Sequence, residues 1–425
     1  MRTERCHAII LKPSEVIGMV CFLCVKHENK DGMVIMAEDT KFTTAKVLSW
    51  IAGQKNKALQ FLDGIKDDMS VVLASKNDLA SVISFFADEK NNEGAQDARK
   101  ALADAALEVR LKAYGNRVFF RGLIEFTNYC KNDCYYCGIG RSQHQVRRYR
   151  LSDEEILSCC RTGEKLGYHS FVLQGGEDPY YTDDRICAII RMIHAAHPNT
   201  AITLSLGEKS HESYLKYFEA GANRYLLRHE TATDEHYRLL HPEEMSLSNR
   251  KECLHDLMSI GYQVGAGFMV GSPYQTPENL AEDLVFLQGL VPHMVGIGPF
   301  IPSSGTRFAD FPAGSLQQTL VMLALTRLLL PKVLLPSTTA LGTIDPFGRE
   351  KGFGYGANVV MPNLSPTSVR ADYALYDNKI CTGDDAVDCQ KCLNGRILRS
   401  GNMPDYTRGD HRDFVPEDIQ PSSIV

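Results

Sequence analysis

Three cysteines, Cys130, Cys134 and Cys137, are the residues of this sequence best placed to do chemistry. Their spacing, Cys-x3-Cys-x2-Cys, lets three thiolates from one short loop point to a common centre, which suits an iron–sulfur cluster. Three ligands leave one iron of a 4Fe-4S cube open. That iron can chelate the amino and carboxylate groups of S-adenosylmethionine, and an electron from the cluster can break the S–C5′ bond to give a 5′-deoxyadenosyl radical. The alternatives are a zinc site and three unrelated buried thiols.

A second cysteine set, Cys381-x7-Cys389-x2-Cys392, lies near the C-terminus in a segment rich in Gly and Asp. This spacing predicts an accessory cluster of 2Fe-2S or 4Fe-4S type, or another metal site, with surface thiols as the alternative. Cys21 and Cys24 form a lone Cys-x2-Cys pair, which we interpret as incidental thiols rather than a metal half-site. The cysteines expected to pack inside helices are Cys159, Cys160, Cys187 and Cys253.

Eight apolar runs alternate with amphipathic segments from Val118 onward, which predicts an α/β fold. The expected architecture is a (β/α)8 barrel of the TIM type, with a six-stranded, partly open barrel as the alternative. Capping residues mark helix starts at Ser152, Thr276 and Ser315. The predicted strands are Val118–Phe126, Ser170–Gln174, Ala201–Leu206, Arg224–Arg228, Gln263–Val270, Met294–Pro299, Lys332–Thr338 and Ala357–Met361.

The remaining segments flank the predicted barrel, which we assign to residues 117–372. Residues 1–74 form an extension that fits the barrel pattern poorly, and residues 75–116 contain two amphipathic helices that lead into it. Residues 373–425 form a tail that carries the second cysteine set and wraps the barrel. We expect a cytoplasmic protein, with organellar targeting by the extension as the alternative.

Enzymes built on such barrels work at the C-terminal ends of the strands, so the residues found there are candidates for binding. The Gly-Gly pair after the second strand lets backbone approach a ligand closely, although a tight turn is the alternative. A carboxylate can grip a ribose diol, and an arginine can bind the methionine carboxylate; mutual ion pairing is the alternative for such residues. The cofactor-binding candidates are Tyr136, Gln174, Gly175, Gly176, Glu177, Thr203, Ser205, Arg228, Glu230 and Arg250.

The last three strands bring hydroxyl groups beside thioethers, which predicts a cavity able to hold a small anion. Ordinary core packing is the alternative for the methionines. His229, between two charged candidates, is interpreted as a core histidine rather than a ligand. The candidates for the substrate cavity are Met294, Thr338, Thr339, Met361 and Tyr373.

Composition excludes several other classes of protein. The formal charge of −6 and the isoelectric point near 6.1 give no basic footprint for nucleic acid. The most apolar run, Leu316–Leu330, contains polar residues and is shorter than the ~20 residues of a membrane span, so no membrane partner is expected. Thirteen cysteines without a secretory signal indicate a reducing compartment.

Several local motifs together resemble a known family. The stretches Ile124–Cys137, Tyr149–Leu151, Tyr225–Thr231 and Thr338–Ala340, with the spacing of the tail cysteines, resemble the radical-SAM family of FeFe-hydrogenase maturases called HydE. The resemblance extends from about Leu79 to Phe414 and implies a role in building the hydrogenase diiron subcluster (H-cluster maturation). It implies that Thr203, Glu230 and Arg250 help hold S-adenosylmethionine.

The resemblance also implies the substrate and the partners. The substrate would be a small iron complex with cysteine, carbonyl and cyanide ligands, whose sulfur the radical would attack. The partners would be an electron donor such as ferredoxin or flavodoxin and the other hydrogenase maturases. One alternative is a radical-SAM reaction on a small organic molecule, as in methylornithine synthase or biotin synthase. Another is a non-catalytic iron–sulfur scaffold, against which the strand-end Gly-Gly-Glu and Arg/Glu residues argue.

Overall fold

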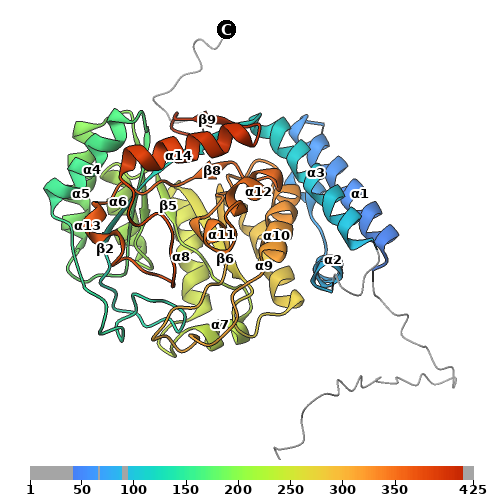
Figure 1. Ribbon diagram of the computed structural model, residues 1–425, viewed down its shortest axis with the longest axis horizontal. Helices are drawn as coiled ribbons and strands as arrows, with labels where there is room; N and C mark the ends of the chain where they lie inside the picture. The colour runs from blue at the N-terminus through green and yellow to red at the C-terminus, as the bar shows by residue number, and fades with distance from the viewer. Residues whose placement is uncertain (1–41, 66–67, 89–93, 415–425) are drawn as a thin grey trace, which may run out of the picture. The chain divides into compact units, whose positions relative to one another are not determined.

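The computed structural model describes residues 42–65, 68–88 and 94–414 (Figure 1). The Cys21/Cys24 pair lies outside these residues. At the centre is a six-stranded parallel sheet whose strands pair in sequence order. The strands are β2 (Gly122–Thr127), β3 (Ser170–Gly175), β4 (Ala201–Ser205), β5 (Arg224–Leu226), β6 (Gln263–Val270) and β7 (Met294–Pro299). The predicted α/β class and six of the predicted strands are therefore confirmed.

The sequence predicted one strand over Val118–Phe126, but the structure has two. β1 (Arg117–Phe120) leaves the large sheet and pairs in parallel with β8 (Val359–Val360) and β9 (Met403–Asp405). Arg121 lies at the break and is fully buried, with Nη1 2.8 Å from Met294 Sδ and Nη2 3.4 Å from Gly409 O. A buried guanidinium needs such partners, and reaching them from this position divides the run in two.

The predicted strand over Lys332–Thr338 does not form a regular ladder. It joins its neighbours through isolated parallel bridges, Met294 with Leu334 and Pro336 with Val359. Pro336 lacks the N–H that a ladder needs, which explains part of this difference. A further bridge joins Leu123 of β2 to Asn363, just after β8.

Helices cover the sheet, and the predicted helix starts are confirmed by side-chain caps. Ser152 and Glu155 form a capping box at α4, Thr276 forms one with Asn279 at α9, and Ser315 caps α10. The helices that follow strands are α4 (Asp153–Lys165), α5 (Asp183–Ala196), α6 (His211–Glu219), α7 (Asp234–Leu240), α8 (Leu247–Ile260), α9 (Pro277–Leu290), α10 (Leu316–Leu329), α11 (Thr339–Ile344), α12 (Gly348–Gly354) and α13 (Thr367–Arg370).

The N-terminal helices pack together beside α9 and α10 (Figure 1). The two predicted helices are present as α2 (Lys76–Ala87) and α3 (Ala95–Tyr114), and they are preceded by α1 (Thr44–Leu62) and a 3-10 turn, η1 (Met69–Val72). α10 is buried from Thr319 to Leu329, as expected for a packed helix. None of the helices in the described part of the chain has the length and apolar character of a membrane span.

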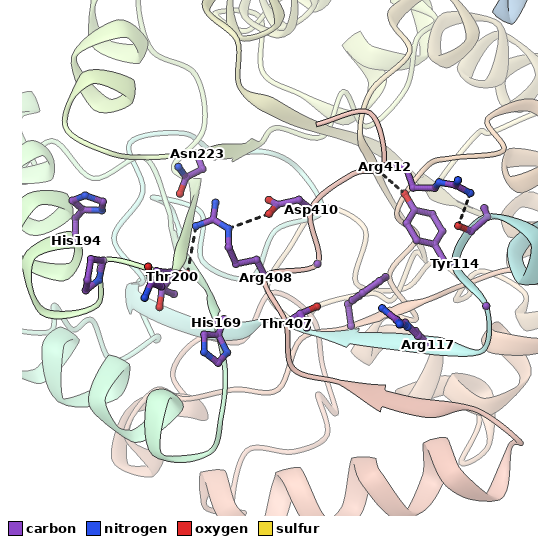
Figure 2. Close-up of a pocket in the computed structure, with 16 residues that line it drawn as sticks. Tyr114, Arg117, His169, His194, Thr200, Asn223, Thr407, Arg408, Asp410 and Arg412 are labelled. Carbon is purple, nitrogen blue, oxygen red and sulfur yellow. Dashed lines mark hydrogen bonds and ion pairs between the residues drawn. The ribbon is translucent and has the colours of Figure 1, made fainter. Parts of the chain in front are cut away.

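The C-terminal segment reaches both ends of the large sheet. Its helix α14 (Ala386–Arg399) leads into β9, and residues 407–412 then run past the N-terminal ends of the strands. A cavity of about 970 Å³ opens there, lined by residues such as Arg117, Thr200 and Arg408 (Figure 2). Thr200 directly precedes β4 and Arg117 begins β1, so this cavity is at the opposite end of the strands from the predicted site.

Candidate active site

A cavity of about 400 Å³ lies at the C-terminal ends of the strands. Every strand of the large sheet contributes residues to its lining, and so does β8 of the small sheet through Val360, as expected for this class of fold. Many of the predicted residues meet there. The predicted residues that line the cavity are Cys134, Tyr136, Cys137, Gln174, Gly175, Ser205, Arg228, Glu230, Arg250, Thr338, Thr339, Met361, Cys381 and Cys389.

The loop with the first cysteine set is fixed by backbone contacts on several sides. Lys131 N donates to Glu177 O at 2.8 Å, and Cys137 N donates to Cys134 O at 3.0 Å. Arg148 donates to four backbone carbonyls around the loop, among them Ile139 O at 2.8 Å. The loop is therefore held without using the three thiols, which remain available as ligands.

The three thiols are suited to metal rather than to acid–base work. Desolvation raises the pKa of Cys130, holds that of Cys134 well above its usual value, and raises that of Cys137 to about 12. The thiols are neutral near pH 7, so a metal must displace their protons to bind. Within the described ranges, no group of three or more His, Cys, Asp or Glu side chains is placed to hold a single metal ion.

The predicted Gly-Gly-Glu turn supports this loop. A Cβ on Gly176 would lie 2.3 Å from Tyr129 O and 2.7 Å from Cys130 Cβ, so only glycine allows the strand end to approach the cysteine loop this closely. Glu177 is buried and accepts from Glu208 N at 2.9 Å, while its other oxygen is 3.1 Å from Lys131 Nζ. Gly175 lines the cavity, whereas Gly176 and Glu177 lie behind it and shape it.

The charged residues after β5 are paired with one another. Arg228 Nη2 lies 3.0 Å from Glu230 Oε2, the ion pair that the sequence left open as an alternative. Arg250 donates to Glu208 and, at 2.6 Å, to Arg228 O. Glu230 has a φ of 65°, a conformation that non-glycine residues rarely adopt and that must be held by its surroundings.

Part of that support is a buried pair behind Glu230. His229 and Asp283 of α9 are both fully buried, with Nε2 and Oδ1 3.3 Å apart. Asp283 Oδ1 accepts from Ala232 N at 2.5 Å, and His229 Nδ1 accepts from Gly267 N at 3.3 Å. Burial lowers the pKa of His229 and raises that of Asp283 well past their usual values, so both are neutral. His229 is a core residue, as predicted.

Tyr136 is held against the cavity by a histidine. His241 Nδ1 lies 3.0 Å from Tyr237 O and therefore carries the ring proton, so Nε2 accepts from Tyr136 Oη at 3.1 Å. Burial lowers the pKa of His241 to about 3, which keeps the ring neutral. The Tyr136 ring thus has a fixed place beside Cys134 and Cys137.

Besides Gly176 and Glu177, the predicted residues Thr203, Met294 and Tyr373 are not part of the lining of the main cavity. Thr203 and Met294 line a separate, small cavity of about 10 Å³ next to Arg121. The Thr203 hydroxyl is buried there without a hydrogen-bond partner among the described residues. Tyr373 is fully buried, so its ring packs into the cavity's surroundings rather than its open wall.

The second cysteine set opens onto the same cavity as the first. Cys381 and Cys389 line it, whereas Cys392 is exposed on α14. Arg349 connects this set to the predicted substrate wall, since Nη2 donates to Thr339 Oγ1 at 3.1 Å and lies 3.8 Å from Cys381 Sγ. The two cysteine sets, distant in sequence, therefore face one space.

Sequence reasoning missed a charged group inside the cavity. Glu125 of β2 is buried, with Oε1 2.6 Å from Lys379 Nζ and Oε2 accepting from Asn363 Nδ2 at 2.7 Å. A carboxylate within the apolar run Leu123–Thr127 is a signal that could have identified Glu125. Lys379 has no comparable signal, because it comes from an irregular tail.

A glycine-supported loop of three cysteines at the carboxyl ends of a parallel sheet is the arrangement of the Radical SAM superfamily. The sequence model of that superfamily matches residues 124–287, which span the cysteine loop and β2 to β6. Membership of this class implies a 4Fe-4S cluster and S-adenosylmethionine, which the three thiols and the adjoining cavity fit.

The chain is 46% identical over 314 residues to the FeFe hydrogenase maturase subunit HydE of Thermotoga maritima, an alignment that covers 74% of this chain and 88% of that protein. The chain therefore belongs to the HydE family, and the resemblance inferred from its motifs is confirmed. It is also 32% identical over 309 residues to the 3-methylornithine synthase of Methanosarcina barkeri, covering 72% of this chain and 83% of that protein. A solved structure of methylornithine synthase superposes with a TM-score of 0.70 at 28% identity, covering 83% of this chain and 97% of that one.

Proposed function

We propose that this chain acts in assembly of the FeFe-hydrogenase diiron subcluster, as a radical enzyme on a small cysteine-ligated iron complex with carbonyl and cyanide ligands. The observation that carries the proposal is that Cys134 and Cys137 line a cavity large enough for both a cosubstrate and a small complex. The 46% identity of the chain to a hydrogenase maturase supports it. Its partners would be an electron donor such as ferredoxin or flavodoxin and the other maturases.

The residue roles follow from this proposal. Cys130, Cys134 and Cys137 would hold the 4Fe-4S cluster, which with S-adenosylmethionine supplies the 5′-deoxyadenosyl radical. Arg250 would help hold the methionine carboxylate, with Tyr136 against the adenine. The other proposed cofactor contacts are Gln174, Gly175, Ser205, Arg228 and Glu230, whereas Gly176 and Glu177 would support the wall from behind and Thr203 lies in the separate small cavity. The substrate wall would consist of Thr338, Thr339 and Met361, with Tyr373 buried behind it and Met294 in the separate small cavity. The accessory cluster would be held by Cys381, Cys389 and Cys392.

The proposal includes the form of the fold and the limits of its parts. The isolated bridges beside β7 and β2 support a closed ring of eight strands, formed by residues 117–372. Residues 75–116 would be the helical lead-in, residues 373–425 the wrapping tail, and residues 1–74 an extension. A cytoplasmic location agrees with the number of free thiols that the described cysteines provide.

A second candidate is favoured by one observation. The buried Glu125–Lys379 pair offers opposite charges to a zwitterion, which an enzyme acting on a free amino acid would need. The hydroxyls and thioethers predicted from the sequence would offer a zwitterion no charged partner, whereas this pair places an ammonium group and a carboxylate at the cavity. The 32% identity to a 3-methylornithine synthase supports the same alternative.

The two candidates are separated by one pair of assays. We expect purified, cluster-loaded protein to raise the activity of apo-hydrogenase matured in vitro with the other maturases, and to form no methylornithine from lysine. A Cys130→Ser variant is the control for effects that need no cluster. Methylornithine formation without any effect on the hydrogenase would establish the second candidate, and iron transfer without cleavage of S-adenosylmethionine would establish a scaffold.

A further inference from the structure

Backbone hydrogen bonds anchor the tail where it crosses the C-terminal end of the large sheet. Leu375 O accepts from Gly138 N at 2.9 Å, directly after the cysteine loop, and Asp377 N donates to Pro302 O at 3.1 Å on the loop after β7. Asp377 also accepts from Ser304 N at 2.9 Å. Asn378 then adopts a φ of 56°, which turns the chain inward. This path places the next residue, Lys379, inside the cavity.

Lys379 is held in the cavity by two of its three possible hydrogen bonds. Its ammonium group lies 2.6 Å from Glu125 Oε1 and donates to Tyr373 O at 2.9 Å. An ammonium group has three donors, so one N–H remains without a hydrogen-bond acceptor among the described residues, although the group also lies 5.0 Å from the centre of the Tyr373 ring. The side chain is 12% exposed and lines the cavity. Glu125, in contrast, uses its other oxygen for Asn363 and is therefore occupied on both sides.

The charge of the cavity wall favours an anion. Its lining contains four cationic side chains, Arg228, Arg250, Arg349 and Lys379, and only two carboxylates, Glu125 and Glu230. Arg228, Arg250 and Glu230 belong to the part beside the cysteine loop. The remaining part, around Lys379, has two cations for one carboxylate, and in a partly enclosed site such an excess attracts a negative ligand strongly.

We propose that Lys379, held in place by Glu125, determines substrate specificity by binding the carboxylate of the amino-acid portion of the substrate. This inference rests on the proposed function, in which the iron complex carries a cysteine ligand. Lysine gives a carboxylate a single charge-assisted hydrogen bond, and Glu125 and Tyr373 O fix the direction of the third donor. Glu125 is a positioning residue that acts through Lys379.

The test compares two synthetic iron(II) carbonyl cyanide complexes that differ in one group. One carries L-cysteine, and the other carries cysteamine, which has the same thiolate and amine but no carboxylate. Binding of each is measured by anaerobic equilibrium dialysis against the cluster-loaded protein with S-adenosylmethionine. We expect Lys379→Met to weaken binding of the cysteine complex on the order of 10- to 30-fold and to leave binding of the cysteamine complex unchanged.

Two further variants separate recognition from structure. The double change Glu125→Gln with Lys379→Met removes the carboxylate that the single change would leave unpaired, and it should show the same selective loss. Lys351→Met removes a lysine paired with Asp345 at 2.8 Å outside the cavity and should affect neither complex. Thermal midpoints of all variants report folding.

The possible results of these binding measurements distinguish failure of the specificity role from failure of the proposed function. An equal loss for both complexes would make the pair a structural anchor of the tail, and no loss for either would also overturn the specificity role. If the unaltered protein binds the cysteine complex no better than the cysteamine complex, this inference is wrong and the proposed function stands. If it binds neither complex, the proposed function itself is wrong.

Discussion

Cys134 of the cysteine loop has a thioether neighbour, since its Sγ lies 3.8 Å from Met245 Sδ. Together with Cys137 it faces the cavity, and desolvation holds its pKa well above the usual value. An alcohol at this position would be still harder to deprotonate and is a poor ligand for iron that requires thiolate. These properties favour metal binding by Cys134 over acid–base chemistry.

We expect Cys134→Ser to abolish reductive cleavage of S-adenosylmethionine while the fold survives, because the loop is held by backbone contacts and Arg148 rather than by the thiol. The measurement is 5′-deoxyadenosine formed under dithionite by anaerobically reconstituted protein. Cys253→Ser, at a cysteine on α8 away from the cavity, is the matched control. If the Cys134→Ser protein cleaves S-adenosylmethionine as fast as the unaltered protein, the chain does not use this cysteine loop for radical chemistry.

From the sequence alone, candidate site residues could be named where the residue type and its position by themselves indicate a role in binding. The cysteines, the Gly-Gly turn and Arg250 were identifiable because each has few alternative uses in such a position. Glu125 and Lys379 were missed because an ion pair becomes visible only when both partners are placed, and 254 positions separate them.

At the scale of elements, α9 supports the segment after β5 through the hydrogen bond of Asp283 and through Phe286, whose ring packs on His229 with centroids 4.9 Å apart. Asp283 accepts from Ala232 N at 2.5 Å inside the core and faces His229. Removing the acceptor leaves a buried N–H unsatisfied, which costs about 1–3 kcal/mol. The same contact holds the turn that gives Glu230 its left-handed backbone.

We therefore expect Asp283→Ala to lower the free energy of unfolding by about 2 kcal/mol and to weaken S-adenosylmethionine binding, because Glu230 loses its support. Asp283→Asn retains an acceptor of the same size, and it should recover most of both losses because Asp283 is already neutral in the fold. Chemical denaturation and calorimetry measure the two effects. Equal losses in the Ala and Asn variants would show that the hydrogen bond is not what holds this turn.

The tail forms the other element-scale unit. We expect Cys389→Ser combined with Cys392→Ala to reduce the iron content of the protein while cleavage of S-adenosylmethionine persists, because the proposed cosubstrate contacts come from strand ends rather than from α14. Iron analysis and the 5′-deoxyadenosine assay are made on the same sample. Loss of cleavage in a well-folded double variant would assign the tail cluster a part in catalysis or electron transfer.

Helices and strands could be predicted from the sequence where the length of an apolar run and the spacing of its apolar residues indicated the same element. The six paired strands and the capped helices followed from apolar runs and from residues such as Ser152 and Thr276. The pattern gives burial but not hydrogen bonding, so it could not distinguish a ladder from the bridges around Leu334. It also gave no sign that Arg121 would break the first run.

For the whole molecule, buried neutral histidines set the response to acid. Burial lowers the pKa of both His241 and His411 to about 3, whereas an unfolded histidine titrates near 6.5. The unfolded chain therefore takes up protons that the folded chain cannot. The stability from these residues is complete above about pH 6.5 and is lost as the pH falls from there toward about 3.

We expect the free energy of unfolding to fall between pH 7.5 and pH 5.5, by about 1 kcal/mol for each of these two histidines. Anaerobic urea denaturation at the two pH values measures it. Asp410, whose pKa is lowered to about 2 by Arg224 and Arg408 against the opposing effect of burial, should contribute only at lower pH. His411→Asn should reduce the difference, and identical unfolding free energies at both pH values would contradict the prediction.

The position of the tail also has a consequence for how the protein is made. Asp410 neutralises Arg224 at one end of the strands at 2.6 Å, and Lys379 neutralises Glu125 at the other at 2.6 Å. Both partners follow the strands in the chain, so until they have been synthesised two buried charges of the large sheet are unpaired, which disfavours its final packing. During that interval the cysteine loop has no Leu375 or Lys379 across it. We therefore expect the cysteine loop to be more accessible to iron before the tail packs across it than afterwards.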